Sequence, residues 1–549
     1  MKKASKLLIA MLLCVTLALS ACGGSSGGAG GSAPAQQPAA AATAAPKAEG
    51  TAPEPAAAQP AAEPAQDVHI NSANLYGLSK LDPHDGWNGW YSCRLGISEC
   101  LTTVDENIEL VPQLADSWER TGELTYCFHI RQGVKFSNGN DLTAEAVKAS
   151  FERLLEMSSR LADLKINSIE VDGENVIFTT TEPYSAFPNA LSEPMCSIVD
   201  VTADTDSFNE MPVCTGPYKV VDYVADEKVE LEANEYYWDG VPAIRYITAL
   251  NIGEDTKVEA ALAGQIDVGQ GANAITLAAL EGQDRVTVVE TLGSRIGMLH
   301  FNCMEGHATA DKNLRLALCY AVNRDVIAQI DGNGYSSPAT TLFAASYGSE
   351  GVTYPTYDPE KAAEYLAAAG YEDKDGNGYV EKDGQELVLD MPLSSTESTA
   401  IQQAMQGMWR DAGIHVELRM VENKIPERDE GRYDIYDSFY QTLNAGDGQT
   451  FLRSNFGSPD AIGRVNVTRY ASADFDAILS ELDKTDVPSE RLDLFMKAQQ
   501  ILSDDAPWLF LYVRENVYMV NSAVVDPASV VAHPIDYYFM TNDWLPAQP

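Results

Sequence analysis

The clearest pattern of hydrophobic and polar positions lies in residues 110–155. Side chains in residues 125–131 alternate in character, which predicts a half-buried strand, and the polar run at 137–140 predicts a tight turn after it. Residues 143–155 begin with a threonine and an acidic first turn and then carry an apolar stripe, which predicts a capped helix. Residues 114–118 predict a short helix before the strand. This stretch contains no residues typical of chemistry, so we interpret it as scaffold.

Strand and helix patterns continue through the rest of the chain. Residues 169–178 predict a β-hairpin with Asp-Gly at its turn. Further strands are predicted at 68–71, 414–420 and 507–512, and further helices at 401–413, 475–482 and 492–502. The 549 residues are enough for two or three domains.

The first residues have the pattern of a targeting signal. Three lysines precede the apolar run 7–19, which is too short to span a membrane permanently. The run ends in Leu-Ser-Ala-Cys, so we expect residues 1–21 to be a lipoprotein signal peptide and Cys22 to carry lipid. The alternative is an ordinary signal peptide followed by an incidental cysteine. Residues 22–66 are rich in Gly, Ala and Pro and cannot bury a core, which predicts a disordered tether.

Composition excludes some classes of function. The formal net charge of −43 argues against binding to nucleic acid. An odd number of cysteines follows Cys22, without any Cys-x-x-Cys pair, which argues against a disulfide framework and a zinc site. These cysteines are Cys93, Cys100, Cys127, Cys196, Cys214, Cys303 and Cys319. One bridge is possible, and Cys196–Cys214 is the pair we favour.

Motifs for catalysis or cofactors are not found. The sequence has no GxSxG, HExxH, phosphate loop or dinucleotide glycine run, so we expect neither an enzyme nor a cofactor. Asp373, Asp375 and Asn377 resemble the start of a calcium loop, although Gly384 stands where a bidentate glutamate is required. The alternative is a tight turn without metal. No other metal site is predicted.

Several sequence motifs resemble those of one known family. They include PQLADSWE at 112–119, YCFHIRQGVKFSNG at 126–139, LTAEAVKASFERL at 142–154, TGPYKV at 215–220 and ALAGQID at 261–267. In this order they resemble the signature of family 5 bacterial solute-binding proteins, the extracytoplasmic receptors of peptide and nickel ABC importers. The resemblance covers about residues 68–545.

This resemblance implies a two-lobed α/β periplasmic-binding-protein fold of the type II, Venus-flytrap kind, with an extra domain inserted in the first lobe. Two strands join the lobes, and the ligand is buried between them on closure. The implied parts are lobe I at 67–105, 215–302 and 511–549, the inserted domain at 106–214, and lobe II at 303–510.

The resemblance also points to a ligand loop at residues 436–452. A gap-free match places Gln441 at the tryptophan of the peptide receptors, Asn444 at their aspartate, and Asp447 at their second acidic residue. In those receptors the aspartate holds the peptide's amino terminus by a charge-assisted bond. Asn444 is neutral, so the sequence departs from the family's pattern for peptides with a free amine.

Other candidates lie outside this loop. Glu193 falls where nickel receptors of the family carry a cleft arginine, so it could bind an amine or guanidinium instead; the alternative is that it faces solvent. Trp90 and Tyr91 belong to a predicted helix that carries Arg94 and Glu99. Arginines suit carboxylates, and the candidates are Arg94, Arg295 and Arg453, unless they form ordinary surface ion pairs.

Together these features predict a monomeric, lipid-anchored receptor on the outer face of the cytoplasmic membrane or in the periplasm. It would capture a small polar solute, a zwitterion, and deliver it to ABC permease subunits. Peptides are the first choice of ligand and a nickel or other metal chelate is the second. A further alternative is a ligand sensor or surface-interaction protein without transport, which the presence or absence of permease and ATPase genes beside this gene would distinguish.

Overall fold

The computed structural model describes residues 67–74, 78–158, 164–272, 274–332, 334–343, 349–395, 399–458 and 466–548. The predicted signal peptide, Cys22 and the predicted tether lie outside these residues. The described residues all belong to one compact unit. None of the described helices is long and apolar enough to cross a membrane.

Strands of the described residues form one mixed sheet of nine strands, one sheet of four and three strand pairs. The strands of the large sheet are β1 (His69–Ala73), β8 (Tyr218–Val224), β9 (Lys228–Ala233), β10 (Tyr246–Leu250), β11 (Val268–Gln270), β12 (Val286–Phe301), β13 (Ser336–Pro338), β18 (Ile435–Gln441) and β19 (Trp508–Asn521). The others are β2 (Thr102–Val104), β3 (Leu110–Pro112), β4 (Ala115–Arg120), β5 (Thr125–Ile130), β6 (Ile166–Asp172), β7 (Asn175–Thr180), β14 (Glu381–Lys382), β15 (Gln385–Glu386), β16 (Val388–Ser394) and β17 (His415–Val421).

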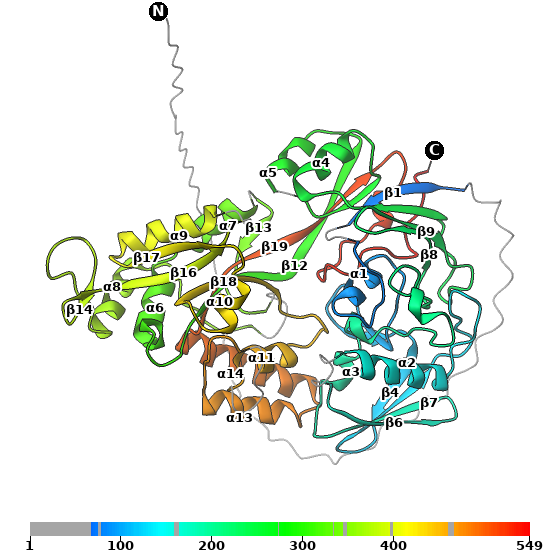
Figure 1. Ribbon diagram of the computed structural model, residues 1–549, viewed down its shortest axis with the longest axis horizontal. Coiled ribbons are helices and arrows are strands. Elements are labelled where there is room, and N and C mark those ends of the chain that lie inside the picture. The colour runs from blue at the N-terminus through cyan, green and yellow to red at the C-terminus, as the bar shows by residue number, and fades with distance from the viewer. Residues whose placement is uncertain are drawn as a thin grey trace, which may run out of the picture. The chain divides into compact units, whose positions relative to one another are not determined.

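Helices surround these sheets (Figure 1). In the first half of the chain they are α1 (Asn88–Arg94), α2 (Ala144–Met157), α3 (Phe187–Ala190), α4 (Glu254–Leu262) and α5 (Ala274–Leu277). In the second half they are α6 (Lys312–Tyr320), α7 (Arg324–Gly332), α8 (Pro359–Ala368), α9 (Ala400–Asp411), α10 (Ile425–Asp429), α11 (Gln449–Phe456), α13 (Ala473–Leu482) and α14 (Pro488–Asp505).

Two long strands, β12 and β19, connect the two lobes (Figure 1). They pair antiparallel, and their register shifts between Leu292 and Ile296. One end of the pair lies beside β11, which pairs in parallel with β1. At the other end, β18 pairs with residues 295–301 of β12. The resulting order is β18-β12-β19-β11-β1-β10-β9-β8, so a single sheet runs through both lobes.

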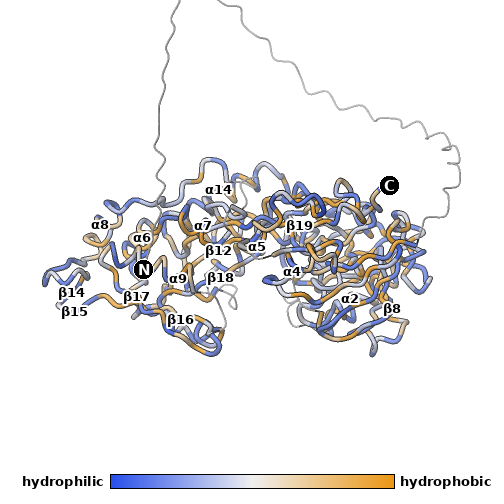
Figure 2. Tube along the Cα trace, turned by 90° about the horizontal axis from the view of Figure 1, so that it is seen from above, coloured by the Kyte–Doolittle hydropathy of each residue, from blue (hydrophilic) through white to orange (hydrophobic). Residues whose placement is uncertain are grey.

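Buried side chains give each lobe its own core. In lobe I the cluster contains Ile70, Leu231 and Trp544, and in lobe II it contains Leu314, Leu389 and Trp409. The amphipathic pattern of residues 401–413 is confirmed, because Met405 and Trp409 of α9 are fully buried. At the periphery of lobe II, Figure 2 shows the β14–β15 hairpin as a hydrophilic segment.

Residues 110–155 fold largely as the sequence predicts. Burial alternates along β5, and the hydroxyl of Thr143 accepts a hydrogen bond from the N–H of Ala146 at the start of α2. Gly139 has φ +89°, as the predicted turn requires. Strands β4, β5, β7 and β6 form a separate four-stranded sheet. Together with α2 it encloses a core that includes Phe128, Phe151 and Phe178. The predicted boundaries of the inserted domain stay a prediction.

The short helix predicted at 114–118 is wrong. Residues 115–120 form strand β4, whose Trp118 lies opposite Phe128 of β5. Pairing with β5 satisfies the backbone hydrogen-bonding groups of this segment, and this tertiary pairing outweighs its local helical pattern. The predicted helix that carries Arg94 also ends earlier than expected, since α1 stops at Arg94 and Glu99 follows it as irregular chain.

The disulfide that we favoured is not formed. Cys196 and Cys214 are both free and buried, and so is Cys100. Cys196 donates instead to the carbonyl of Ala190, at 3.6 Å. Burial raises the pKa of these thiols well above the ordinary range, so each packs as a small apolar side chain.

Glu99 is a buried carboxyl that ties α1 to the segment before β10. It accepts hydrogen bonds from the Tyr237 hydroxyl at 3.1 Å and from Trp238 Nε1 at 3.1 Å. Burial raises the pKa of Glu99 to about 7, although hydrogen bonds from Trp238 and Tyr237 oppose the shift. The folded protein therefore holds this group protonated at a pH where the unfolded chain has released the proton.

We therefore expect Glu99 to make the protein less stable as the pH rises from about 4.5 to about 7, by up to about 3 kcal/mol. The variant Glu99→Gln has no proton to release, so this part of the pH dependence should disappear. Urea denaturation of both proteins at pH 5 and pH 8 measures it. Equal pH dependence in the two proteins would contradict the assignment.

Candidate functional site

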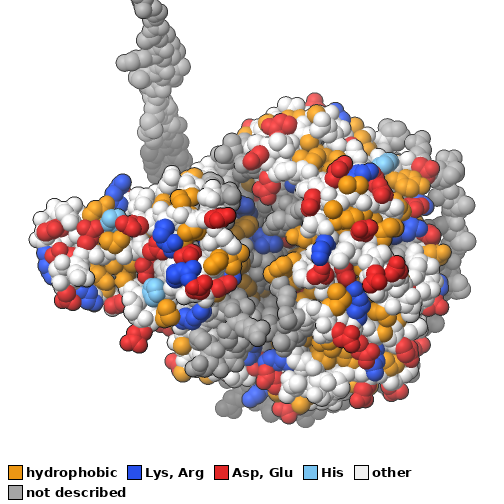
Figure 3. All heavy atoms as spheres, in the orientation of Figure 1, with side chains coloured by type: hydrophobic (Ala, Val, Ile, Leu, Met, Phe, Trp, Pro, Cys, Tyr) orange, Lys and Arg blue, Asp and Glu red, His pale blue; other side chains and the backbone are white. Residues whose placement is uncertain are grey.

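A cavity of about 320 Å³ lies beside the two connecting strands. The chain that leaves the carboxyl end of β11, at Gln270–Ala272, forms part of its wall, which is where α/β folds commonly bind ligands. Lobe II supplies the end of α7, β13 and Phe439 of β18. Figure 3 shows a hollow between the lobes on one face, with basic side chains inside it. The volume is at the small end of the range for ligand pockets.

The floor of the cavity is formed by Asp536, which joins two arginines. Its side chain is 1% exposed, and its two oxygens pair with Arg94 Nη2 at 3.1 Å and Arg295 Nε at 2.5 Å. Burial alone would raise the pKa of Asp536, but Arg295 and Arg94 outweigh it and hold this pKa below its ordinary value. The carboxylate is therefore ionised, and it fixes both guanidiniums.

A second pair lies on the lobe II side. Arg514 of β19 donates two parallel hydrogen bonds to Asp331 of α7, at 2.8 and 2.6 Å. Burial disfavours the charged form of Arg514, but the ion pair outweighs it and the pKa of Arg514 lies above its ordinary value. The ring of Phe439 lies 4.7 Å from the Arg514 guanidinium carbon and 5.9 Å from that of Arg295. Aromatic and charged groups thus meet on one wall.

Arg295 enters the cavity from the register shift of β12. Between Leu292 and Ile296 the strand leaves β19, and the N–H of Ser294 donates instead to the carbonyl of Pro534 at 3.0 Å. On the other edge, Gln441 Nε2 donates to the Ser294 hydroxyl at 2.8 Å. A bulge of this kind redirects one side chain without ending the strand.

The sequence candidates do not gather in one place. Arg295 lines the cavity and Arg94 lies behind it on Asp536. Gln441 is beside Arg295 in the sheet, and its buried Oε1 has no hydrogen-bond partner among the described residues. Trp90 is 9% exposed and packs in a cluster with Leu443 and Trp508, while Tyr91 next to it is half-buried.

The remaining candidates lie at a second junction, where residues 444–491 meet residues 184–193 and Tyr537. The backbone carbonyl of Asn444 accepts from the Tyr537 hydroxyl, and Asp447 pairs with the buried Arg491 at 2.7 Å. Glu193 is half-buried and close enough to Tyr184 and Tyr537 to raise their pKa values, although burial is the larger cause for both. None of these three candidates lines the cavity.

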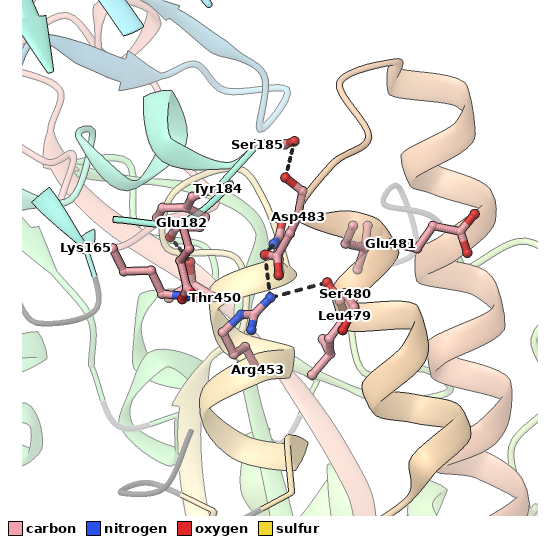
Figure 4. A network of polar contacts seen from close by, with 12 residues as sticks. Lys165, Glu182, Tyr184, Ser185, Thr450, Arg453, Leu479, Ser480, Glu481 and Asp483 are labelled. Atoms are coloured by element: carbon pink, nitrogen blue, oxygen red, sulfur yellow. Dashed lines mark hydrogen bonds and ion pairs between the residues drawn. The ribbon is translucent and has the colours of Figure 1, made fainter. Parts of the chain in front are cut away.

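This junction is a network of polar contacts (Figure 4). The Tyr184 hydroxyl and that of Thr450 are 2.7 Å apart, and the Ser185 hydroxyl donates to the carbonyl of Asp483 at 2.9 Å. Arg453, a sequence candidate for a carboxylate partner, pairs with the Asp483 side chain. Its guanidinium therefore holds α11 against α13.

The predicted calcium loop satisfies its oxygens internally. Asp373 accepts from the N–H groups of Gly376 and Gly378, at 2.7 and 3.0 Å, and Asp375 accepts from the N–H of Asn377 at 3.0 Å. Within the described ranges no group of three or more His, Cys, Asp or Glu side chains is placed to hold a metal ion.

Of the residues that form the two ion pairs of the cavity lining, three were not predicted from the sequence: Asp331, Arg514 and Asp536. None of them belongs to a motif, and the partners of each pair are far apart in the chain. Arg94 and Asp536, for example, are 442 positions apart. Only the alternation of β19 could have indicated that Arg514 interrupts a buried strand.

Replacing Asp536 with Asn should lower the free energy of unfolding by about 3–5 kcal/mol, because the buried Arg94 and the half-buried Arg295 lose their shared anion. Urea denaturation measures the difference. The control is Asp543→Asn, the same change at an exposed position of the same segment, which should stay within about 0.5 kcal/mol of the parent. If both variants are equally stable, the ion-pair network does not stabilise the fold.

Known proteins resemble this chain over most of its length. The nickel-binding protein NikA of Staphylococcus aureus is 25% identical over 435 residues, which cover 78% of this chain and 86% of that protein. The glutathione-binding protein GsiB of Shigella flexneri is 27% identical over 468 residues, covering 80% and 88%. The crystal structure of a nickel ABC transporter protein from Bacillus halodurans matches with a TM-score of 0.74 and 28% identity, covering 87% of this chain and 99% of that one.

A family model decides the assignment. The model described as the middle part of bacterial extracellular solute-binding proteins, family 5, matches residues 109–462. That match includes the inserted sheet, β12, β18 and the Arg295 region of the cavity. The two-lobed fold predicted from the sequence is confirmed. This chain belongs to the family 5 bacterial extracellular solute-binding proteins, the extracytoplasmic solute receptors of ABC importers.

Proposed function

We propose that the receptor captures a small, polar, zwitterionic solute in the cavity beside Arg295 and delivers it to an ABC permease. The observation that carries this proposal is the cavity itself, which has an arginine–carboxylate pair on each side and an aromatic ring between them. Arg295 lines the cavity and is oriented there by its bond from Nε to Asp536, and the planar fork of a guanidinium suits a ligand carboxylate.

Peptides are our first choice of ligand, and a nickel or other metal chelate is the second. Relatives whose names specify glutathione and nickel support both choices. The small cavity favours a short peptide over a long one. The remaining sequence candidates stay proposals for contacts with parts of the ligand that extend beyond the cavity. They are Trp90, Tyr91, Glu193, Gln441, Asn444 and Asp447.

Binding without catalysis fits the relatives reported above, which are named as binding proteins. We propose that this chain is likewise a receptor and not an enzyme. Its attachment to the membrane would be through lipid on Cys22, which lies outside the described residues. The lipoprotein motif and the long polar tether support that attachment.

Mass spectrometry of the solute that co-purifies with the natively folded protein tests the proposed ligand. We expect a short peptide or a metal chelate in about one-to-one ratio, with metal analysis to separate the two. The identified solute should then bind Arg295→Lys at least about tenfold more weakly, because an ammonium cannot replace the planar fork of a guanidinium. Unchanged affinity would contradict the role of Arg295.

Ligand binding should also draw the lobes together. A ligand that contacts both lobes binds the closed state more tightly and shifts the population toward it. Small-angle X-ray scattering should therefore give a smaller radius of gyration at saturating ligand. The variant Arg295→Lys without bound ligand is the control. An unchanged radius at verified saturation would contradict closure.

For the lipid anchor, the change to test is Cys22→Ser. Without the thiol no lipid can be attached, so the variant should move from the membrane fraction to the soluble fraction of the envelope. Fractionation followed by immunoblotting measures the shift. The variant Cys14→Ser, within the predicted signal peptide, is the control and should remain membrane-bound. Membrane retention of Cys22→Ser would contradict the proposed anchor.

A further inference from the structure

The charges around the cavity indicate which solutes it accepts, and this inference rests on the proposed function. Two arginines and four carboxylates line it, so the lining has a formal charge of −2. They are Arg295, Arg514, Glu254, Asp331, Glu515 and Asp536. Two buried cations lie behind this lining: Arg94 at Asp536, and Lys257, whose Nζ donates to the carbonyl of Gln270 at 2.7 Å.

Each arginine of the lining is paired with a buried anion. Arg295 pairs with Asp536, and Arg514 pairs with Asp331, whose side chain is 2% exposed. Both anions are buried beneath the cavity and face their guanidiniums at hydrogen-bond distance. The two remaining carboxylates of the lining, Glu254 and Glu515, are not part of these pairs and can face an entering solute.

Burial acts to lower the pKa of Arg514 and of Lys257, and the nearby Glu254 opposes this effect without forming an ion pair with either. Glu254 is the first residue of α4 and is exposed, and Glu515 of β19 is half-buried. Among the described residues, neither side chain forms a hydrogen bond or an ion pair with the protein. Burial, and then the nearby Glu290, raise the pKa of Glu515, so its surroundings add negative charge and no counter-ion.

A buried acceptor in the same wall points independently to a donor on the ligand. Gln270 lines the cavity and is 2% exposed. Its Nε2 donates to the carbonyl of Asp536, which fixes the orientation of the amide. Its Oε1 accepts no hydrogen bond from the described part of the protein. A buried carbonyl oxygen without a donor is costly, and a ligand N–H group would satisfy it.

We propose that the cavity selects a compact organic cation, with its ammonium or guanidinium group bound by Glu254 and Glu515 and one of its N–H groups donated to Gln270 Oε1. A carboxylate on the same ligand, where present, binds Arg295. A short peptide with a basic side chain and a free polyamine share this chemistry. The site thus supplies the negative charge that Asn444 lacks.

Isothermal titration calorimetry of the ligand-free receptor with four probes tests this selection. The probes are the dipeptides Lys-Ala, Ala-Ala and Glu-Ala, of net charge +1, 0 and −1, and spermidine. We expect Lys-Ala to bind at least about tenfold more tightly than Ala-Ala, and Glu-Ala to bind most weakly. If spermidine binds more tightly than Lys-Ala, the polyamine is identified as the source of the cation, and this result also supports the proposal.

Substitutions of the two glutamates test where the cation of the ligand binds. Glu515→Gln should weaken the tightest cationic probe about tenfold, and Glu254→Gln about threefold because that residue is exposed. Glu481→Gln, the same change on the exposed face of α13, is the matched control and should leave affinity unchanged. Urea denaturation of each variant confirms that it folds.

Three results would overturn the inference: no binding of either cationic probe, equal or tighter binding of Ala-Ala or Glu-Ala, or loss of cation binding in Glu193→Gln with none in Glu254→Gln and Glu515→Gln. The last result would place the amine anchor at Glu193. Each of these outcomes leaves the receptor role intact, because that role depends on whether a solute co-purifies at all.

Discussion

The pairing of β12 with β19 is the constraint on which the rest of the structure depends. These strands run antiparallel from lobe I to lobe II, and every other strand of the large sheet joins directly or indirectly to one of them. Because the same two strands belong to both cores, the lobes cannot separate without breaking this ladder. The register of the ladder shifts between Leu292 and Ile296 and again between Gly297 and Met298, and at the first shift Arg295 turns into the cavity.

The cavity and the connection are therefore one physical system. Asp536, from the C-terminal segment, pairs with Arg94 of α1 and Arg295 of β12, so it joins three distant parts of the chain beneath the ligand. Asp331 of α7 likewise pairs with Arg514 of β19 and so joins these two elements. Buried ion pairs add little stability over apolar residues but are costly to break, so these pairs hold the arginines in fixed orientations. Relative motion of the lobes must occur around them.

Much of the fold could be predicted from the sequence, because its local patterns and its global pairing agree. The alternation of residues 125–130, the cap at Thr143 and the apolar face at Met405 and Trp409 all occur as predicted. Residues 115–120 are the exception, since pairing with β5 decided their conformation and no local pattern shows that.

The cavity could be predicted only in part. Arg295 was identified as a possible carboxylate partner, but Asp536 and Arg514 have no sequence pattern that marks them. Their role comes from contacts between residues hundreds of positions apart, which spacing and composition do not encode. The loop 436–452 was expected to carry the ligand contacts, yet Asp447 is bound to Arg491, and of this loop Phe439 is the residue that reaches the cavity.

The most direct test of the account is a crystal structure of the receptor with its co-purified solute. The account predicts electron density for the solute in the cavity, with a contact to Arg295 and a solute N–H group within hydrogen-bond distance of Gln270 Oε1. Density elsewhere, for example beside Glu193 and Trp90 with the cavity at Arg295 containing solvent alone, would contradict it.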